Sequence, residues 1–299
     1  MRFASVCAGI DSASVAWRPL GWRAVLFSEI APFPCAVLAH HYPEVPNLGD
    51  LNGFRSWPDA IFDVLVGGTP CQSFSVAGFR AGFADAGGNL ALVYLEVLRR
   101  HRPRWFVWEN VPGVLSSHGG RDFGSFIGGV AELGYGYAWR TLNARGFGVS
   151  QQRARVFVVG CAESWASPAA VLFEPESLRG NFETRRGSSP EDPPAVEACA
   201  RDGRPVFVGS AEGPEIFLTR SNIGKQANNQ APLVAAGDTV RRFTALECER
   251  LQGFPDHYTA ITYRGRPAAD APRYEAIGNA IAVPCLRWIG ERIEQVAQL

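Results

Sequence analysis

Short apolar runs alternate with helix-like stretches over residues 1–161, and this rhythm limits the possible folds more than any other feature of the chain. The runs "IFDVLVGG" and "RWFVWENVPG" are continuous in apolar residues, as are strands buried on both faces. Further strands are predicted at "RFASVCAG", "RAVLFSEI", "YAWRTLNA" and "ARVFVVGC", and helices at "DSASVAWRPLG", "PFPCAVLAHHYP", "NLALVYLEVLRRHRP" and "FGSFIGGVAELGYG". This alternation favours a doubly wound α/β sheet with its chemistry at the carboxyl ends of the strands.

The composition and the periodicity of the chain change after residue 161. Residues 162–242 are rich in Pro, Gly, Ser and Glu and show little periodicity, which predicts a smaller, loop-rich domain. Regularity returns in residues 243–299, where Thr244 and Glu247 form a capping-box pattern that opens a helix. The last stretch, "YEAIGNAIAVPCLRWIGERIEQVAQL", is predicted to be a turn followed by an amphipathic helix that packs on the first domain, residues 1–161.

The cysteines and the hydropathy of the chain indicate the cellular compartment in which the protein is expected. The seven cysteines are odd in number and never spaced as CxxC, which argues against a disulfide framework and a zinc ribbon. No apolar run approaches the roughly 20 residues that span a bilayer, and the N-terminus has no long apolar stretch of the secretory kind. We therefore expect a cytoplasmic protein with free thiols that binds no metal and no membrane, and we expect it to act as a monomer.

The charge balance alone does not identify a partner. The formal net charge is zero, and Lys225 is the only lysine, so 28 of the 29 basic residues are Arg. Arginine suits phosphate groups and guanine edges better than lysine does. A genome rich in G and C would produce the same bias.

Polar residues near the ends of the first strands are candidates for binding a nucleotide-like cofactor. The segment "CAGIDS" is a small-residue turn between a strand and a helix, where helical N–H groups can receive such a ligand. Glu29 ends the next strand and is placed to accept both hydroxyls of a ribose; the alternative is a solvated loop acid. Asp50 could accept from an adenine amino group, or could be only a turn residue.

Cys71 and Glu109 end the next two predicted strands and should meet at the same edge of the sheet. A cysteine nucleophile needs exposure, backbone N–H groups and an acid or base partner. The segment "VGGTPCQ" offers a tight, accessible turn for Cys71, and Glu109 offers the partner. The alternative is that Cys71 is a small buried hydrophobic residue, the commoner situation for an isolated cysteine.

The chain resembles the bacterial and phage DNA (cytosine-5)-methyltransferases. The matching segments are "SVCAGIDSA", "SEI", "GDL", "GGTPCQSFS", "GNLALVYLEVLRRHRPRWFVWENV", "SQQRARVFVVG", "RRFTALECERLQGFPDHY" and "YEAIGNAIAVPC". They occur in the order of the family and leave only about residues 162–240 unmatched. The resemblance implies a Rossmann-like S-adenosylmethionine-dependent methyltransferase fold with a mixed, mostly parallel sheet and a small target-recognition domain.

The resemblance also implies a reaction. Cys71 would attack carbon 6 of a cytosine flipped out of duplex DNA, while Glu109 would hydrogen-bond to ring N3 and the exocyclic amine. The methyl group of S-adenosylmethionine would then pass to carbon 5. Arg153 and Arg155 would hold the base and the catalytic loop, with Arg155 at the cytosine carbonyl; Arg153 could instead be a surface residue at a strand edge.

The family pattern carries binding residues onto this sequence. The implied cofactor pocket consists of Cys7, Ala8, Gly9, Ile10, Glu29, Ile30, Asp50, Leu51, Pro70, Leu90, Asn279, Ala280 and Ile281. The expected DNA contacts are Gln72, Ser73, Ser75, Arg220, Asn222, Lys225, Gln226 and Arg241. The chain departs from the family in having Cys7 where an aromatic residue is common, and Asp11-Ser12 where two glycines are common; we interpret Asp11 as a helix cap.

Two alternatives to this function remain. A transfer RNA cytosine-5 methyltransferase shares the cysteine and the "ENV" motif, but its loop usually differs from "GGTPCQSFS". A non-catalytic DNA-binding relative is the other alternative, and the intact Cys71, Glu109 and Arg155 argue against it. Amino-methyltransferases of adenine or cytosine use a (D/N/S)PP(Y/F) loop, which this chain lacks. A base-flipping enzyme of DNA methylation, of the kind found in restriction–modification systems, is therefore the expected function.

Overall fold

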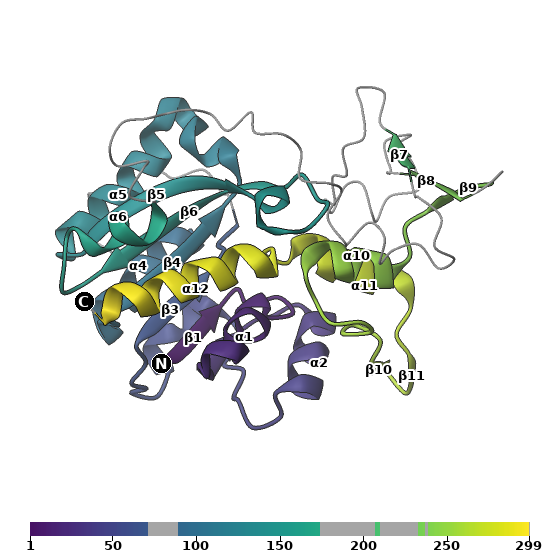
Figure 1. Ribbon diagram of the computed structural model, residues 1–299. Coiled ribbons are helices and arrows are strands. Elements are labelled where there is room, and N and C mark those ends of the chain that lie inside the picture. The colour runs from purple at the N-terminus through teal and green to yellow at the C-terminus, as the bar shows by residue number, and fades with distance from the viewer. Residues whose placement is uncertain (71–88, 174–206, 210–232, 237–238, 299) are drawn as a thin grey trace.

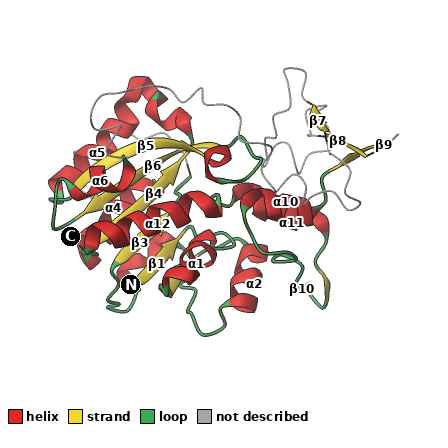
Figure 2. Ribbon diagram, viewed as in Figure 1, coloured by secondary structure: helices red, strands yellow, loops and turns green. Residues whose placement is uncertain are grey.

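A six-stranded sheet forms the centre of the computed structural model, which describes residues 1–70, 89–173, 207–209, 233–236 and 239–298 (Figures 1 and 2). The strands lie in the order β2-β1-β3-β4-β6-β5. Their bounds are Arg2–Val6 (β1), Arg23–Ser28 (β2), Val64–Gly67 (β3), Trp105–Asn110 (β4), Gly136–Asn143 (β5) and Ala154–Cys161 (β6). All six lie where the apolar runs predicted strands.

The direction of β6 decides which residues meet at the active edge of the sheet. Strands β2, β1, β3 and β4 are parallel, whereas β6 runs antiparallel to both β4 and β5. The sheet is therefore mixed and mostly parallel, as expected. Because β6 is reversed, its first residues lie beside the last residues of β4, and Val156 is the register partner of Asn110.

Helices cover both faces of this sheet (Figure 1). One face packs against α1 (Ser12–Trp17), α2 (Pro32–His41), α6 (Ser167–Leu172) and α12 (Val283–Ala297), and the other against α4 (Leu90–His101) and α5 (Arg121–Glu132). Short 3-10 turns lie at Arg18–Leu20, Leu51–Ser56, Pro112–Leu115, Ser117–Gly120 and Ala144–Phe147. Each face has its own apolar core, as a doubly wound sheet requires.

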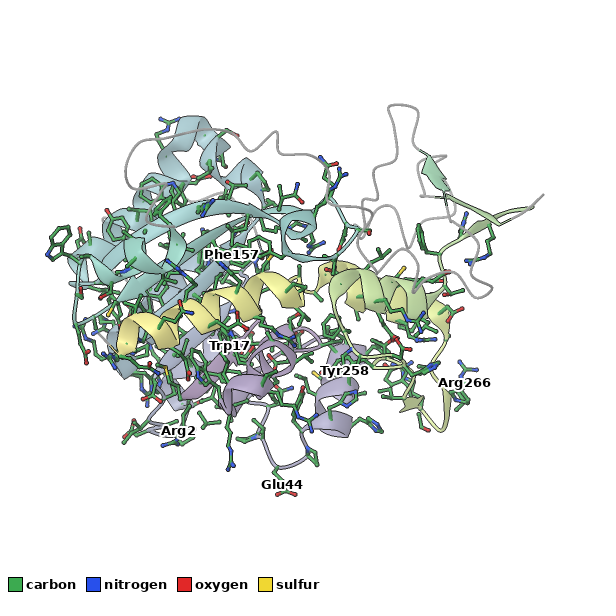
Figure 3. The ribbon with its side chains drawn as sticks, in the orientation of Figure 1. Arg2, Trp17, Glu44, Phe157, Tyr258 and Arg266 are labelled. Atoms are coloured by element: carbon green, nitrogen blue, oxygen red, sulfur yellow. The ribbon has the colours of Figure 1, made fainter. Side chains whose placement is uncertain are left out.

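The C-terminal helix α12 packs closely on α1. The indole N–H of Trp17 donates to the carbonyl oxygen of Leu286 at 2.7 Å, and Trp17 is fully buried (Figure 3). A Cβ added at Gly290 would lie 2.5 Å from the Trp17 ring, so only glycine allows this approach. Helix α6 contacts both β5 and α12, so the chain up to Phe173 stays with the large sheet.

The return segment differs from the sequence expectation at one place. Helix α10 (Ala245–Gln252) opens with the predicted capping box, in which Thr244 and Glu247 bond each other's backbone N–H groups. The turn predicted at the beginning of the last stretch is wrong: Tyr274 to Asn279 belong to helix α11 (Asp270–Asn279). A hairpin, β10 (Thr262–Tyr263) with β11 (Arg266–Pro267), connects the two helices.

The described part of residues 162–242 contains a second, antiparallel sheet. Its strands are β7 (Phe207–Gly209), β8 (Leu233–Ala236) and β9 (Thr239–Arg242), in that order. Within the described ranges, no helix combines the length and the apolar character needed to cross a bilayer.

Candidate active site

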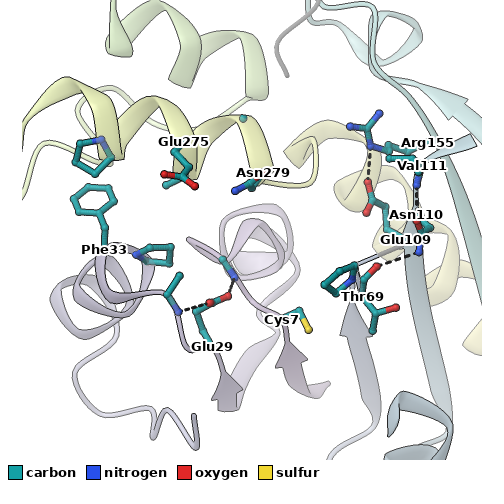
Figure 4. Close-up of a pocket in the computed structure, with 18 of the residues that line it drawn as sticks. Cys7, Glu29, Phe33, Thr69, Glu109, Asn110, Val111, Arg155, Glu275 and Asn279 are labelled. Atoms are coloured by element: carbon teal, nitrogen blue, oxygen red, sulfur yellow. Dashed lines mark hydrogen bonds and ion pairs between the residues drawn. The ribbon is translucent and has the colours of Figure 1, made fainter. Parts of the chain in front are cut away.

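One large cavity lies over the carboxyl ends of the parallel strands, with α11 as its roof (Figure 4). Its volume is about 770 Å³, and its lining comes from the turns after β1, β2, β3 and β4, from the start of β6 and from α11. Pockets of this size accept drug-sized ligands. The carboxyl ends of the parallel strands therefore converge at this cavity.

Glu109 is a buried acid at the end of β4. Its residue is 8% exposed, and its Oε1 lies 3.1 Å from Nε of Arg155 in an ion pair (Figure 4). Burial raises the pKa of Glu109, although the charges of Arg153 and Arg155 oppose this shift. A Cβ at Gly68 would lie 2.7 Å from the other carboxylate oxygen, so the glycine makes room for the acid.

The two arginines of the "QQRAR" segment have different partners. Arg155 pairs with Glu109, whereas Arg153 donates to the carbonyl oxygens of Gly278 at 3.0 Å and Ala280 at 2.8 Å. Burial, and then the charge of Arg155, lower the pKa of Arg153 to about 10. Arg153 is 5% exposed, so the alternative of a surface residue at a strand edge is wrong.

Gln252 supports the same end of α11. Its side-chain N–H group donates to the carbonyl oxygen of Ile277 at 2.9 Å, and the residue is fully buried. The last carbonyls of a helix have no partner within it. Arg153, the residue before β6, and Gln252 of α10 supply such partners, and together they hold the last turn of α11, which carries Asn279 at the cavity wall.

The turn after β1 faces the acid at the end of β2. Glu29 accepts hydrogen bonds from the backbone N–H groups of Gly9 at 2.7 Å, Ile30 at 2.8 Å and Ala31 at 2.7 Å. Gly9 has a φ of 57°, and space next to it is open. The carboxylate thus joins two turns, and Oε2 has acceptor capacity left for a ligand hydroxyl.

The remaining predicted cofactor residues divide into four groups. Cys7, Pro70 and Asn279 line the large cavity, and Ala8, Ala280 and Ile281 line an adjoining cavity of about 40 Å³. Ile10 and Leu51 are buried in the two cores, and Leu90 is partly buried against one of them. Ile30 is 68% exposed, and exposed Asp50 accepts from the N–H of Asn52 at 2.9 Å.

Some predicted residues lie outside the described ranges. Cys71, Gln72, Ser73, Ser75, Arg220, Asn222, Lys225 and Gln226 are in this group. Arg241 is described at the end of β9, where it forms an ion pair of 2.7 Å with Glu247.

The cavity also contains residues that the sequence analysis missed. Phe33 of α2 and Pro272 of α11 line it, and Glu275 projects from the roof (Figure 4). A signal for Glu275 was present, because it stands four residues before Asn279 and shares its face of a helix. The prediction of a turn there concealed this relationship.

Asp11 caps α1, as interpreted from the sequence. Its carboxylate accepts from the backbone N–H of Ser14 at 3.2 Å. Burial raises the pKa of Asp11 to about 6, while hydrogen bonds from Ser14 and Ser5 oppose the shift. In the described residues, no group of three acidic, His or Cys side chains is arranged to hold a metal.

Comparison with known families gives a match along nearly the whole chain. The family model for C-5 cytosine-specific DNA methylase matches residues 1–177 and 176–295. The chain belongs to this family. The family expected from the motifs is thus confirmed.

Curated relatives come from bacteria and phages. The type II methyltransferase M.HpaII of Haemophilus parainfluenzae is 29% identical over 97% of this methylase and 88% of its own length, and M2.BsuMI of Bacillus subtilis is 28% identical over 99% and 76%. A protein of Escherichia phage P1, named DNA N-6-adenine-methyltransferase, is 33% identical over 97% of the chain. The chain spans only 61% of that phage protein.

Solved structures share the fold. Dnmt2 methyltransferase of S. pombe superposes with a TM-score of 0.73 over 99% of both chains at 16% identity. A putative DNA modification methyltransferase from an E. coli prophage gives a TM-score of 0.63 over all of both chains at 15% identity. The expected α/β methyltransferase fold is confirmed.

Proposed function

We propose that this protein methylates carbon 5 of cytosine in duplex DNA. The observation that carries this proposal is the buried Glu109–Arg155 pair, which shares one cavity with Pro70 and with the Gly9–Glu29 turn. An acid held in a protein interior beside a cation suits a ring nitrogen that gains a proton during reaction. Cys71 follows Pro70 directly in the sequence, so the nucleophile would enter beside this pair.

The proposed chemistry assigns one task to each group. The Cys71 thiolate forms a bond to carbon 6, and the electrons of the C5–C6 double bond move to the C4–C5 bond. The electrons of the C4–N3 double bond move to N3, which takes a proton from Glu109. Carbon 5 is then nucleophilic toward a methyl group, and the N3 proton returns to Glu109 as the C5–methyl bond forms. Loss of the carbon 5 proton to water breaks the C6–S bond and releases the Cys71 thiolate. Arg155 would stabilise the charge on the ring and on the acid throughout.

S-adenosylmethionine is the methyl donor that the family implies, and it supplies an electrophilic methyl group when bound. The chemistry of the cavity fits it: a turn without a side chain at Gly9, a carboxylate with remaining acceptor capacity at Glu29, and a volume of about 770 Å³. Cys7, Pro70 and Asn279 would enclose it. Glu29 already accepts three backbone hydrogen bonds, so we propose that it receives one ribose hydroxyl and not two.

Target recognition is proposed for the segment between the two parts of the methylase core. Because α6 packs on β5, we place the start of this domain after Phe173 and not at residue 162, and its end at Arg242. Asn and Gln suit adenine edges and Arg suits guanine, so Arg220, Asn222, Lys225 and Gln226 are proposed base or phosphate contacts. Gln72, Ser73 and Ser75 would contact the DNA backbone, and Arg241 is proposed as a further DNA contact. A cytoplasmic monomer, acting alone or beside a restriction nuclease, agrees with this assignment.

The decisive experiment is nucleoside mass spectrometry. The purified protein is incubated with S-adenosylmethionine and either duplex DNA or transfer RNA, and 5-methylcytosine, N4-methylcytosine and N6-methyladenine are measured. We expect 5-methylcytosine in DNA alone, and none with Cys71→Ser. Methylated adenine, which the name of the phage P1 relative suggests for that protein, or a product only in transfer RNA, would overturn the proposal. A covalent adduct with DNA containing 5-fluorocytosine, absent in Cys71→Ser, tests the nucleophile directly.

A further inference from the structure

Thr69 is held by two side chains of β4, the strand that also carries Glu109. The indole N–H of Trp108 donates to the Thr69 hydroxyl at 2.9 Å, and the side-chain amide of Asn110 donates to the Thr69 carbonyl oxygen at 3.0 Å. All three residues are buried, with at most 4% exposed. Hydrogen bonds shielded from water are strong and their loss is costly, so this contact fixes the backbone at Thr69.

The two donors and the acid lie on opposite faces of the strand. Successive side chains of a strand point to opposite faces, so Trp108 and Asn110 share one face and Glu109 has the other. Trp108 belongs to the apolar core beneath α4 and α5, whereas Trp105 and Val107 belong to the core on the other face. The Thr69 contacts are therefore separate from the Glu109–Arg155 pair.

The neighbouring chain makes this anchor relevant to the reaction. Thr69 precedes Cys71 by two residues, and the residue between them is Pro70, whose ring fixes its φ angle. Side chains of β4 thus bind the residue that directly precedes Pro70 and Cys71. Strand β4 therefore carries Glu109 and also both side chains that hold the backbone leading to Cys71.

We propose that Thr69, Trp108 and Asn110 form a latch that sets the position of Cys71 relative to Glu109 for attack on carbon 6. This inference rests on the proposed function. The three are positioning residues, since they act through the backbone that leads to Cys71. Thr69 and Asn110 also line the large cavity, so the test measures thiol attack and cofactor affinity separately.

The test separates thiol attack from cofactor binding. Attack at carbon 6 makes the carbon 5 hydrogen exchangeable, so release of tritium from DNA labelled at cytosine carbon 5 reports the attack. The variants are Thr69→Val, which removes the hydroxyl at nearly constant shape, Thr69→Ser, which retains it, and Trp108→Phe. Trp105→Phe is the matched control: Trp105 lies on the same strand, is 1% exposed, and its indole N–H has no hydrogen-bond partner among the described residues.

We expect Thr69→Val and Trp108→Phe each to slow exchange and methylation on the order of tenfold to a hundredfold, the loss that a misplaced reacting group causes. Calorimetric affinity for S-adenosylmethionine should change less than about twofold, as for an intact cofactor pocket. Thr69→Ser and Trp105→Phe should retain the wild-type exchange rate.

Wild-type exchange in both Thr69→Val and Trp108→Phe overturns the latch but leaves the proposed function standing. An equal loss in Trp105→Phe also overturns it, because the effect then belongs to core packing. A wild-type protein that makes no 5-methylcytosine overturns the proposed function itself.

Discussion

Nε of Arg155 lies 3.1 Å from Oε1 of Glu109, and the two side chains come from antiparallel strands that meet at one edge of the sheet. The buried carboxyl therefore has a cation beside it. Burial outweighs the charge of this cation and still raises the pKa of Glu109. A carboxyl with a raised pKa retains its proton to higher pH than an ordinary glutamic acid. This is the property that a proton donor to cytosine N3 needs.

Glu109→Gln tests that role. Glutamine can hydrogen-bond to the base but cannot transfer a proton, so single-turnover methylation should fall by about a hundredfold or more. The wild-type rate should decline as the pH rises through the raised pKa of Glu109, and this decline should be absent in the variant. A Glu109→Gln enzyme with the wild-type rate, or with the same pH profile, would contradict the assignment.

Gly68→Ala tests the space beside the acid. Its Cβ would lie 2.7 Å from the Glu109 carboxylate, so the acid must shift and the turnover number should fall by at least about tenfold. Gly113→Ala is the control, because a Cβ there meets nothing within 4 Å. Equal activity of the two variants would argue against a tightly placed Glu109. The measurement is 5-methylcytosine formation at saturating DNA.

Gln252→Met tests the support of the cofactor wall. The variant loses the bond to the carbonyl oxygen of Ile277, and a lost hydrogen bond of about 1 kcal/mol corresponds to about fivefold weaker binding of S-adenosylmethionine. Isothermal calorimetry without DNA measures this. Gln295→Met, at an exposed position of α12, should bind as the wild type does. An unchanged affinity in Gln252→Met would show that the turn at Asn279 holds without it.

Asp11→Asn should stabilise the protein at neutral pH. The folded-state pKa of Asp11 is about 6 against an ordinary value of 3.8, so its contribution to stability is full below pH 3.8 and is lost as the pH rises through 6. The interval corresponds to at most about 3 kcal/mol. Asparagine caps a helix as well as aspartate does and tolerates the positive φ of this position. Urea unfolding at pH 8 should show the gain, and unfolding at pH 4 should show little; a gain of equal size at both pH values would contradict the prediction.

Gly290→Ala should destabilise the fold. The added methyl group would lie 2.5 Å from the Trp17 ring, an overpacking that costs about 1–3 kcal/mol. Gly128→Ala is the same substitution within α5 at a position with open space, and it should stabilise the protein by about 0.5–1 kcal/mol. Denaturant unfolding distinguishes the two. Similar free energies of unfolding for both variants would contradict the close packing of α12 on α1.

The sequence predicted those helices and strands whose formation depends on neighbouring residues. Continuous apolar runs predicted β3 and β4, and the pattern at Thr244 and Glu247 predicted the start of α10. Helix α11 was not predicted, because "APRYEAIGN" contains Pro and Gly and has little helical periodicity. Its stability comes from elsewhere in the chain: Arg273 pairs with buried Glu249, and Gln252 and Arg153 bond its last carbonyls.

By itself, the sequence determined the family and the positions of the large sheet's strands along the chain, and it singled out Glu109 and Arg155, which the structure pairs. Neighbouring residues decide apolar runs, turns and caps, so these can be recognised without coordinates. Only the tertiary structure decided that Arg153 holds the end of α11, that Glu29 is already committed to three backbone N–H groups, and that Trp108 holds Thr69. The physical reason is that each of these contacts joins segments that meet only when the sheet closes, and hydrogen-bond geometry at 3 Å is set by that closure and not by sequence spacing.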